Sequence, residues 1–366
     1  MAEQAIYLNH AGTSWPKPPA VVEAVVEAMN SSPKRWSDRF EQAHSEIAEF
    51  FGIGDPAQLL ITPGCTSSIA VGLGDIDLEG RRRVLTSTWE HHAMHRPLLQ
   101  LREAGIAVDY IPPDSTSALD LDQLEHRLAK GDVGLVAITA SANVTGDVLP
   151  YQTAIELAHQ YDAQVFIDAA QVVGWLDLDL IALGADVVAF GGHKGLQGPW
   201  GIGGLYFSAD ARTKCAARSG NPSPADKSQR PGYCDVGSVD QVALAGLHAA
   251  IRWLKASHRA HNLAQARKQI AYIESALNDA GARCIGIHDP GGRMPTVAFS
   301  AGSKTSSEFA ATLRAEGVIV GSGHQCAPLA HSHLGTEAEG LVRVSVGPLQ
   351  DANEIRTATE TICRLL

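Results

Sequence analysis

The chain has 366 residues, of which 45% are hydrophobic and 19% charged, and 35 are glycines. These values exclude a small stapled fold, a fibre and a disordered chain, and they predict a packed enzyme of two domains or of one domain with a lobe. The formal net charge of -11 argues against general affinity for nucleic acid or an anionic membrane, so a small-molecule substrate is expected. The first residues lack a basic start, and no apolar run is long enough to cross a bilayer, so we expect a cytoplasmic protein.

Short apolar runs alternate with amphipathic helical patterns along the first part of the chain. We expect buried strands at 58–64, 83–88, 107–113, 133–140, 164–170, 186–192 and 203–208. Such alternation predicts an α/β fold with a mostly parallel sheet covered by helices on both faces. Ligands of such sheets bind at the carboxyl ends of the strands.

The remaining third of the chain has a different pattern. Residues 215–233 are rich in Ser, Pro, Gly and charge, which predicts a surface loop. From about 238 to 280 the apolar residues follow helical spacing, and Gly281 is the expected stop. Beyond it, a strand, a helix and further strands predict a smaller α+β unit.

The six cysteines are scattered without CxxC spacing, so we expect reduced thiols and neither a disulfide scaffold nor a zinc ribbon. Most such thiols are small buried hydrophobes. Cys326 is unusual because it lies in "GSGHQCAP", between a histidine-bearing turn and a proline.

Polar side chains follow two of the expected strands. Asp168 and Gln171 come at the end of one, and His193 and Lys194 follow another. A buried lysine amine is a nucleophile able to form a Schiff base, and a nearby aspartate can hold a pyridinium nitrogen protonated. The pair therefore suggests pyridoxal phosphate, although a solvated lysine and a helix-capping aspartate are the alternative.

Two further segments support a cofactor site. In "ITPGCTSSIA" a strand leads through a glycine turn into a helix, where backbone N–H groups and Thr66 could hold a phosphate. In "STWEHHAMH" His91 follows another strand, and its ring could lie on a pyridine ring, although a capping or core histidine is the commoner case.

The chain resembles the class V, fold-type I pyridoxal-phosphate enzymes, and within them the cysteine desulfurase and selenocysteine lyase group. The resemblance runs in family order through "YLNHAGTSWPKP", "PGCTSSIA", "EHHAMH", "SANVTGDVLP", "IDAAQVVGWLDLDL", "FGGHKGLQGPWGIGGLY", "GSGHQCAPLAH" and "GLVRVSVGP". It implies a large cofactor-binding domain (21–245), a smaller C-terminal domain with the cysteine loop (246–366), and an N-terminal segment (1–20) packed near the active site.

The resemblance also implies roles for individual residues. Lys194 would bind the cofactor, Asp168 its ring nitrogen and Gln171 its phenolic oxygen, with His91 stacked on the ring. The phosphate ligands would be Thr66, His193, the backbone of Cys65 and, from the partner subunit of a homodimer, Ser238. Asn143 would lie beside the substrate, and Arg343 would bind the substrate carboxylate through a two-pronged pair.

In that family a cysteine at the position of Cys326 attacks the sulfur of L-cysteine, and selenocysteine is a possible second substrate. The products would be alanine and a persulfide for transfer to an acceptor protein. His324 could lower the thiol pKa if it is cationic, or it could relay a proton. An inert loop thiol is the alternative for Cys326.

The chain departs from the family pattern in several places. Gly191 stands where desulfurases commonly have a serine or threonine, and Gly321 stands where an active-site arginine is common. The segment 29–48 and the region before "CDVGS" look shortened. These departures leave open the shape of the entrance and the choice of substrate.

Other functions compete with desulfuration. A C–S lyase that forms pyruvate from cysteine or cystine would leave Cys326 a spectator, and aminotransferase or epimerase action is also compatible with the fold. A binding-only module would need a defective Lys194, Asp168 or Arg343. A metal-dependent hydrolase could use the histidines of "HHAMH" and "HQCAPLAHSH", but HExxH is absent and Lys194 would be unexplained.

Overall fold

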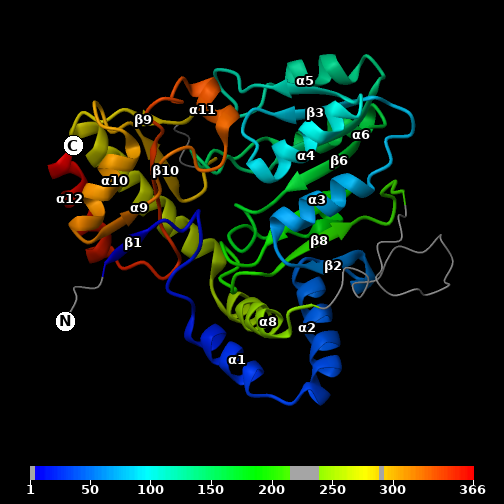
Figure 1. The fold of residues 1–366 in the computed structure, drawn as a ribbon, viewed down its shortest axis with the longest axis horizontal. Helices are drawn as coiled ribbons and strands as arrows, with labels where there is room; N and C mark the ends of the chain where they lie inside the picture. Colours follow the sequence, from blue (N-terminus) through cyan, green and yellow to red (C-terminus); the bar gives the residue numbers. More distant parts are fainter. Residues whose placement is uncertain (1–4, 215–238, 288–291) are drawn as a thin grey trace.

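A computed structural model describes residues 5–214, 239–287 and 292–366 (Figure 1). Its central sheet has the strand order β2-β8-β7-β6-β5-β3-β4, in which only β8 runs antiparallel to its neighbours. The strands are β2 (Leu59–Thr62), β3 (Arg83–Ser87), β4 (Ala107–Ile111), β5 (Val133–Thr139), β6 (Gln164–Asp168), β7 (Val187–Gly191) and β8 (Gly203–Phe207). Every strand expected up to residue 208 is confirmed, and so is the mostly parallel α/β sheet.

The sheet is buried on both faces because successive side chains of each strand enter different apolar clusters. On β6, Phe166 packs in the cluster with α3 and α4, whereas Val165 and Ile167 pack in the larger cluster on the other face. The helices of this region are α1 (Pro19–Met29), α2 (Trp36–Phe50), α3 (Cys65–Asp75), α4 (His92–Glu103), α5 (Leu121–Leu128), α6 (Tyr151–Gln160) and α7 (Leu180–Leu183), with short 3-10 turns at Pro33–Arg35 and Pro56–Gln58. Burial on both faces explains why the strands are continuous apolar runs rather than alternating ones.

The helical pattern after residue 238 forms two helices, α8 (Gln241–Ala256) and α9 (Arg259–Asp279). Asp240 begins α8 by accepting from the N–H groups of Val242 and Ala243. Gly281 follows α9 with φ of 82°, as expected of a helix stop. The expected loop at 215–233, and Ser238, lie outside the described residues.

The C-terminal part is a smaller α+β unit, as expected. An antiparallel sheet has the order β12-β10-β9, and β1 pairs in parallel with β11. The elements are β1 (Ile6–Leu8), β9 (Cys284–Ile285), β10 (Thr296–Phe299), β11 (Val318–Val320), β12 (Val342–Ser345), α10 (Ser306–Ala315), α11 (Pro328–Leu334) and α12 (Ala352–Leu365). The N-terminal segment therefore joins the C-terminal unit through β1, and our domain boundaries remain a prediction.

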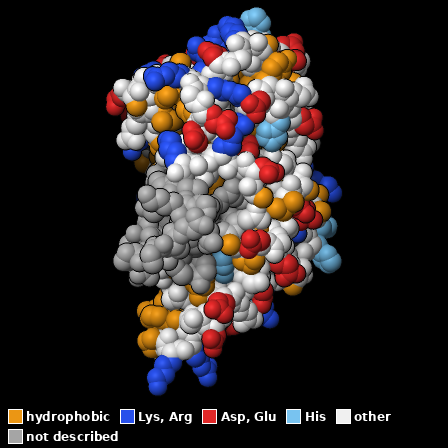
Figure 2. All heavy atoms as spheres, turned by 90° about the vertical axis from the view of Figure 1, so that its right-hand side faces the viewer, with side chains coloured by type: hydrophobic (Ala, Val, Ile, Leu, Met, Phe, Trp, Pro, Cys, Tyr) orange, Lys and Arg blue, Asp and Glu red, His pale blue; other side chains and the backbone are white. Residues whose placement is uncertain are grey.

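Helix α1 leaves an apolar stripe uncovered. Val22, Val26 and Met29 lie at helical spacing and are 51%, 53% and 71% exposed. Figure 2 shows hydrophobic side chains at the lower end of the molecule, where α1 and α2 lie in Figure 1. None of the described helices is long and apolar enough to cross a membrane.

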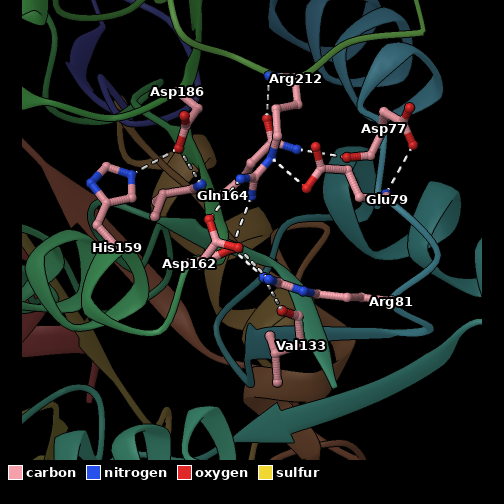
Figure 3. A network of polar contacts seen from close by, with 10 residues as sticks. Asp77, Glu79, Arg81, Val133, His159, Asp162, Gln164, Asp186 and Arg212 are labelled. Atoms are coloured by element: carbon pink, nitrogen blue, oxygen red, sulfur yellow. Dashed lines mark hydrogen bonds and ion pairs between the residues drawn. The ribbon is translucent and has the colours of Figure 1, made fainter. Parts of the chain in front are cut away.

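A polar network joins the loops at the amino ends of β6 and β7 (Figure 3). Asp162 pairs with Arg81 and Arg212, and Asp186 accepts from His159 Nε2 at 2.9 Å and from the Val165 N–H at 2.7 Å. These partners satisfy one another at the edge of the sheet opposite to the carboxyl ends. We therefore expect this network to stabilise the fold rather than to bind a ligand.

Candidate active site

The loops at the carboxyl ends of the strands surround a cavity of about 430 Å³. Strand β6 ends at Asp168, β7 leads into His193 and Lys194, and the loop after β5 carries Asn143. The predicted site residues that line the cavity are Cys65, Thr66, His91, Asn143, Asp168, Gln171, His193, Lys194, Cys326 and Arg343. The fold thus brings together residues from five strand ends and from the C-terminal unit.

Lys194 and Asp168 both line the cavity and interact electrostatically. Burial lowers the pKa of the Lys194 amine, while the Asp168 carboxyl opposes that shift. Asp168 is 4% exposed, and its Oδ1 accepts from the Ala170 N–H at 2.9 Å and from Cys65 Sγ at 3.4 Å. These contacts hold the carboxyl group still, and the desolvated amine is a better nucleophile and base than a surface lysine.

The start of α3 borders the cavity and has no side-chain cap among the described residues. Gly64 precedes the helix with φ of 149°, and no described side chain caps it. The N–H groups of the first turn, at Cys65 and Thr66, are therefore left for a ligand. A Cβ at Gly191 would lie 3.5 Å from Cys65 Cβ, an ordinary contact, so the lack of a side chain there is not a steric requirement.

Residues of the N-terminal segment support His193. Thr13 Oγ1 lies 3.1 Å from His193 Nδ1, and the His193 carbonyl accepts from Ser14 N–H at 2.9 Å and Lys17 Nζ at 3.0 Å. Burial, with the charges of Lys194 and Lys17, lowers the pKa of His193 to about 4. Sequence reasoning missed Thr13, Ser14 and Lys17, whose only signal was their place in the motif "AGTSWPKP".

His91 and Gln171 each use one polar atom to hold the local backbone. His91 Nδ1 accepts from the Ala93 N–H at 3.0 Å and so caps α4, which places the ring proton on Nε2. Burial, followed by the charge of Lys194, lowers the pKa of His91 to about 4. Gln171 Nε2 donates to the Ala11 carbonyl at 3.1 Å. His91 therefore lines the cavity as a neutral imidazole.

Arg343 is 4% exposed and has neutral partners. Its Nη1 donates to the Asn143 carbonyl at 2.7 Å and its Nη2 to Asn9 Oδ1 at 2.9 Å, while its Nε is buried without a partner among the described residues. Burial lowers its pKa to about 10, so the group stays charged at neutral pH. A Cβ at Gly321 would lie 2.9 Å from Asn9 Oδ1, so the glycine makes room for Asn9.

Cys326 is exposed at the rim of the cavity, on a loop with an uncommon backbone. Gln325 and Cys326 have φ of 43° and 59°. Asn143 Nδ2 donates to the Gln325 carbonyl and the His92 N–H to the Cys326 carbonyl, both at 2.7 Å. The loop is thereby fastened to the large sheet on both sides of the thiol.

Of the predicted site residues that the structure describes, His324 alone does not line the cavity. Its Nε2 lies 2.8 Å from the Glu337 carbonyl, and its ring lies 4.9 Å from that of His331. Within the described ranges, no three His, Cys, Asp or Glu side chains gather as a metal site.

A model of the class-V aminotransferase family matches residues 6–357. The chain belongs to the class-V aminotransferase family. A probable cysteine desulfurase of Pseudomonas aeruginosa is 31% identical over 97% of this chain and 92% of its own, and one of Methanothermobacter thermautotrophicus is 27% identical over 98% and 94%.

Solved structures agree with this class-V fold. A cysteine desulfurase of Escherichia coli superposes with a TM-score of 0.88 at 25% identity, covering 99% of this chain and 94% of that one. The apo cysteine desulfurase of Thermococcus onnurineus has a TM-score of 0.91 at 24% identity over the same shares of the two chains, a likeness of fold.

Proposed function

We propose that this class-V family member is a pyridoxal-phosphate-dependent cysteine desulfurase, which converts L-cysteine to L-alanine and holds the sulfur as a persulfide on Cys326. The observation that carries the proposal is an exposed thiol at the rim of a cavity that also contains Lys194, Asp168 and Arg343. The names of the similar proteins support it.

The residues present fit pyridoxal phosphate. Lys194 would bind it, with Asp168, Gln171 and His91 around its ring, and the first turn of α3 with His193 would hold its phosphate. The buried Asn143 Oδ1 has no partner among the described residues, which is expected of an acceptor that a bound group satisfies. When bound, the cofactor supplies an electron sink for charge at the substrate Cα. Ser238, outside the described residues, remains a proposed phosphate ligand from the partner subunit.

The chain's own residues then carry out the binding and proton steps. Arg343 binds the substrate carboxylate, for which its neutral partners leave the full positive charge. Lys194 Nζ is the base that would remove the Cα proton of the substrate. The Cys326 thiolate attacks the substrate sulfur, so an S–S bond forms, the C–S bond breaks, and its electron pair stays with the carbon fragment that is protonated to alanine.

The first experiment measures alanine, pyruvate and sulfide from L-cysteine, with and without reductant, for the natural chain and Cys326→Ala. We expect alanine as the main product and a loss of about 100-fold or more in the variant, because the nucleophile is gone. Cys363→Ala is the matched control, since Cys363 lies on α12 and its thiol donates to the Ala276 carbonyl.

Pyruvate that survives Cys326→Ala would instead assign a C–S lyase to the same fold. If neither product forms although cofactor is bound, another amino acid is the substrate, as a class-V aminotransferase would require. L-Selenocysteine, measured in parallel, tests the second proposed substrate.

We also propose a homodimer, a protein acceptor for the sulfur and a cytoplasmic location. The uncovered apolar stripe of α1 supports the dimer. An acceptor can approach because the Cys326 thiol is exposed. Unpaired thiols at the described cysteines are compatible with a reducing compartment.

A further inference from the structure

Asn143 has three polar groups in three different situations. Its amide nitrogen binds the thiol loop, its main-chain carbonyl binds Arg343, and its amide oxygen is buried without a partner among the described residues. We propose that it is a positioning residue for the Cys326 thiol, which links the thiol loop to the group bound in the cavity. The expected loss of activity rests on the proposed function, whereas the expected support of the thiol loop does not.

The orientation of the Asn143 amide follows from its partner. The Gln325 carbonyl oxygen, 2.7 Å away, can only accept, so the amide nitrogen must face the loop. The amide oxygen is then left on the other side. Asn143 is 8% exposed and lines the cavity, and its Oδ1 has no partner among the described residues. A donor on a molecule bound beside Asn143 is the partner that we infer for it.

The loop needs this support because of its backbone. Gln325 and Cys326 both adopt the left-handed region, which is unfavourable for residues with a Cβ and which persists only where the surroundings impose it. The hydrogen bond from Asn143 and the one from the His92 N–H to the Cys326 carbonyl flank the thiol-bearing residue. Removing the Asn143 amide leaves the Gln325 carbonyl without its donor.

The third polar group of Asn143 connects the loop to the substrate's expected anchor. The main-chain carbonyl of Asn143 accepts from Arg343 Nη1 at 2.7 Å. Because this bond uses the backbone, a change of the side chain preserves it. A change of the Asn143 side chain therefore leaves this anchor of Arg343 in place.

The test compares Asn143→Ala and Asn143→Asp with the natural chain. The aspartate has the same shape but places an acceptor against the Gln325 carbonyl, so it breaks the bond without creating a cavity. Hydrogen exchange of peptides covering 324–327 should be at least about 10-fold faster in both variants. With L-cysteine as substrate, kcat for alanine should fall at least about 10-fold and pyruvate should gain share, because the thiol is no longer held in place.

Two results would overturn the proposal. Exchange at 324–327 that stays within about twofold of the natural chain in both variants would show that Asn143 does not hold the loop. Addition of pyridoxal phosphate to the cofactor-free natural chain should slow this exchange. An unchanged rate would show that the loop is not linked to the group bound in the cavity. The exchange measurement needs no activity and can also be made on Cys326→Ala. It therefore still tests whether Asn143 holds the loop if the chain makes no alanine and the proposed function fails.

Discussion

Asn9 is a neutral partner of Arg343 and leaves the positive charge of its guanidinium available to a ligand. It accepts from Arg343 Nη2 at 2.9 Å and occupies the space that any side chain at Gly321 would need. Because Asn9 is neutral and the other partner is a carbonyl, the guanidinium keeps its charge for an incoming carboxylate. The glycine at 321, a departure from the family pattern, is thus matched by the asparagine beside it.

Asn9→Asp should weaken substrate binding, because the new carboxylate would pair with Arg343 and compete with the substrate. We expect KM for L-cysteine to rise at least about 10-fold, equivalent to about 1.4 kcal/mol, with a smaller change in kcat. Steady-state kinetics on alanine formation measures this. Asn353→Asp, an exposed change of the same charge on α12, is the control, and equal KM values in the two variants would refute the role of Asn9.

The amino ends of β6 and β7 are tied together by side chains rather than by the ladder alone. Asp186 joins the His159 imidazole of α6 to the Val165 N–H of β6 (Figure 3). The hydrogen bond that His159 donates to the Asp186 carboxylate raises the pKa of His159 above its usual value. This pair therefore stabilises the fold fully at pH values below the ordinary histidine pKa, and its contribution is lost as pH rises through the raised value.

His159→Gln should lower the melting temperature more at pH 5.5 than at pH 8.5. The His159 side chain is 42% exposed, so solvent screening keeps the effect below about 1 kcal/mol and the difference near 1–2 °C. Calorimetry of the cofactor-loaded protein at both pH values measures it. An equal loss at the two pH values, or a larger loss at pH 8.5, would contradict this assignment.

At the scale of the whole molecule, helix α1 carries an apolar stripe that is exposed among the described residues. Val22, Val26 and Met29 are the exposed apolar residues of α1, and Trp200 at the cavity rim is 63% exposed. Helix α1 and the segment of Trp200 are linked through α8, because Val25 and Pro199 both pack against Gly246. A second copy seated there would cover the stripe and one side of the cavity entrance.

Val26→Glu combined with Met29→Glu should convert a dimer into a monomer, since two buried charges at an apolar interface are unfavourable. Light scattering should give twice 38.7 kDa for the natural chain and one chain's mass for the variant. Tyr272→Glu, a change at a 46% exposed residue of α9, should remain dimeric. A monomeric natural chain would disprove the dimer.

The sequence alone predicted the strands, the parallel sheet and the cavity-lining residues at the strand ends. Strands such as β6 and β7 are buried on both faces and therefore stand out as apolar runs. Asp168 ends β6, and Lys194 comes three residues after β7. Local patterning was sufficient there because burial and chemistry are encoded within a few neighbouring residues. The break between α8 and α9, by contrast, was not visible in the continuous helical spacing.

Only the tertiary structure decided how distant segments complete the site. The bond between Asn9 and Arg343 joins residues 334 positions apart, and Thr13 meets His193 across 180 positions. The bond from Asn143 to the Gln325 carbonyl spans 182. These contacts depend on the parallel pairing of β1 with β11 and on the order of strands in the sheet, which are set by packing over the whole chain. No local pattern carries them, because each partner alone is an ordinary polar residue whose neighbours in the sequence do not indicate what it will contact.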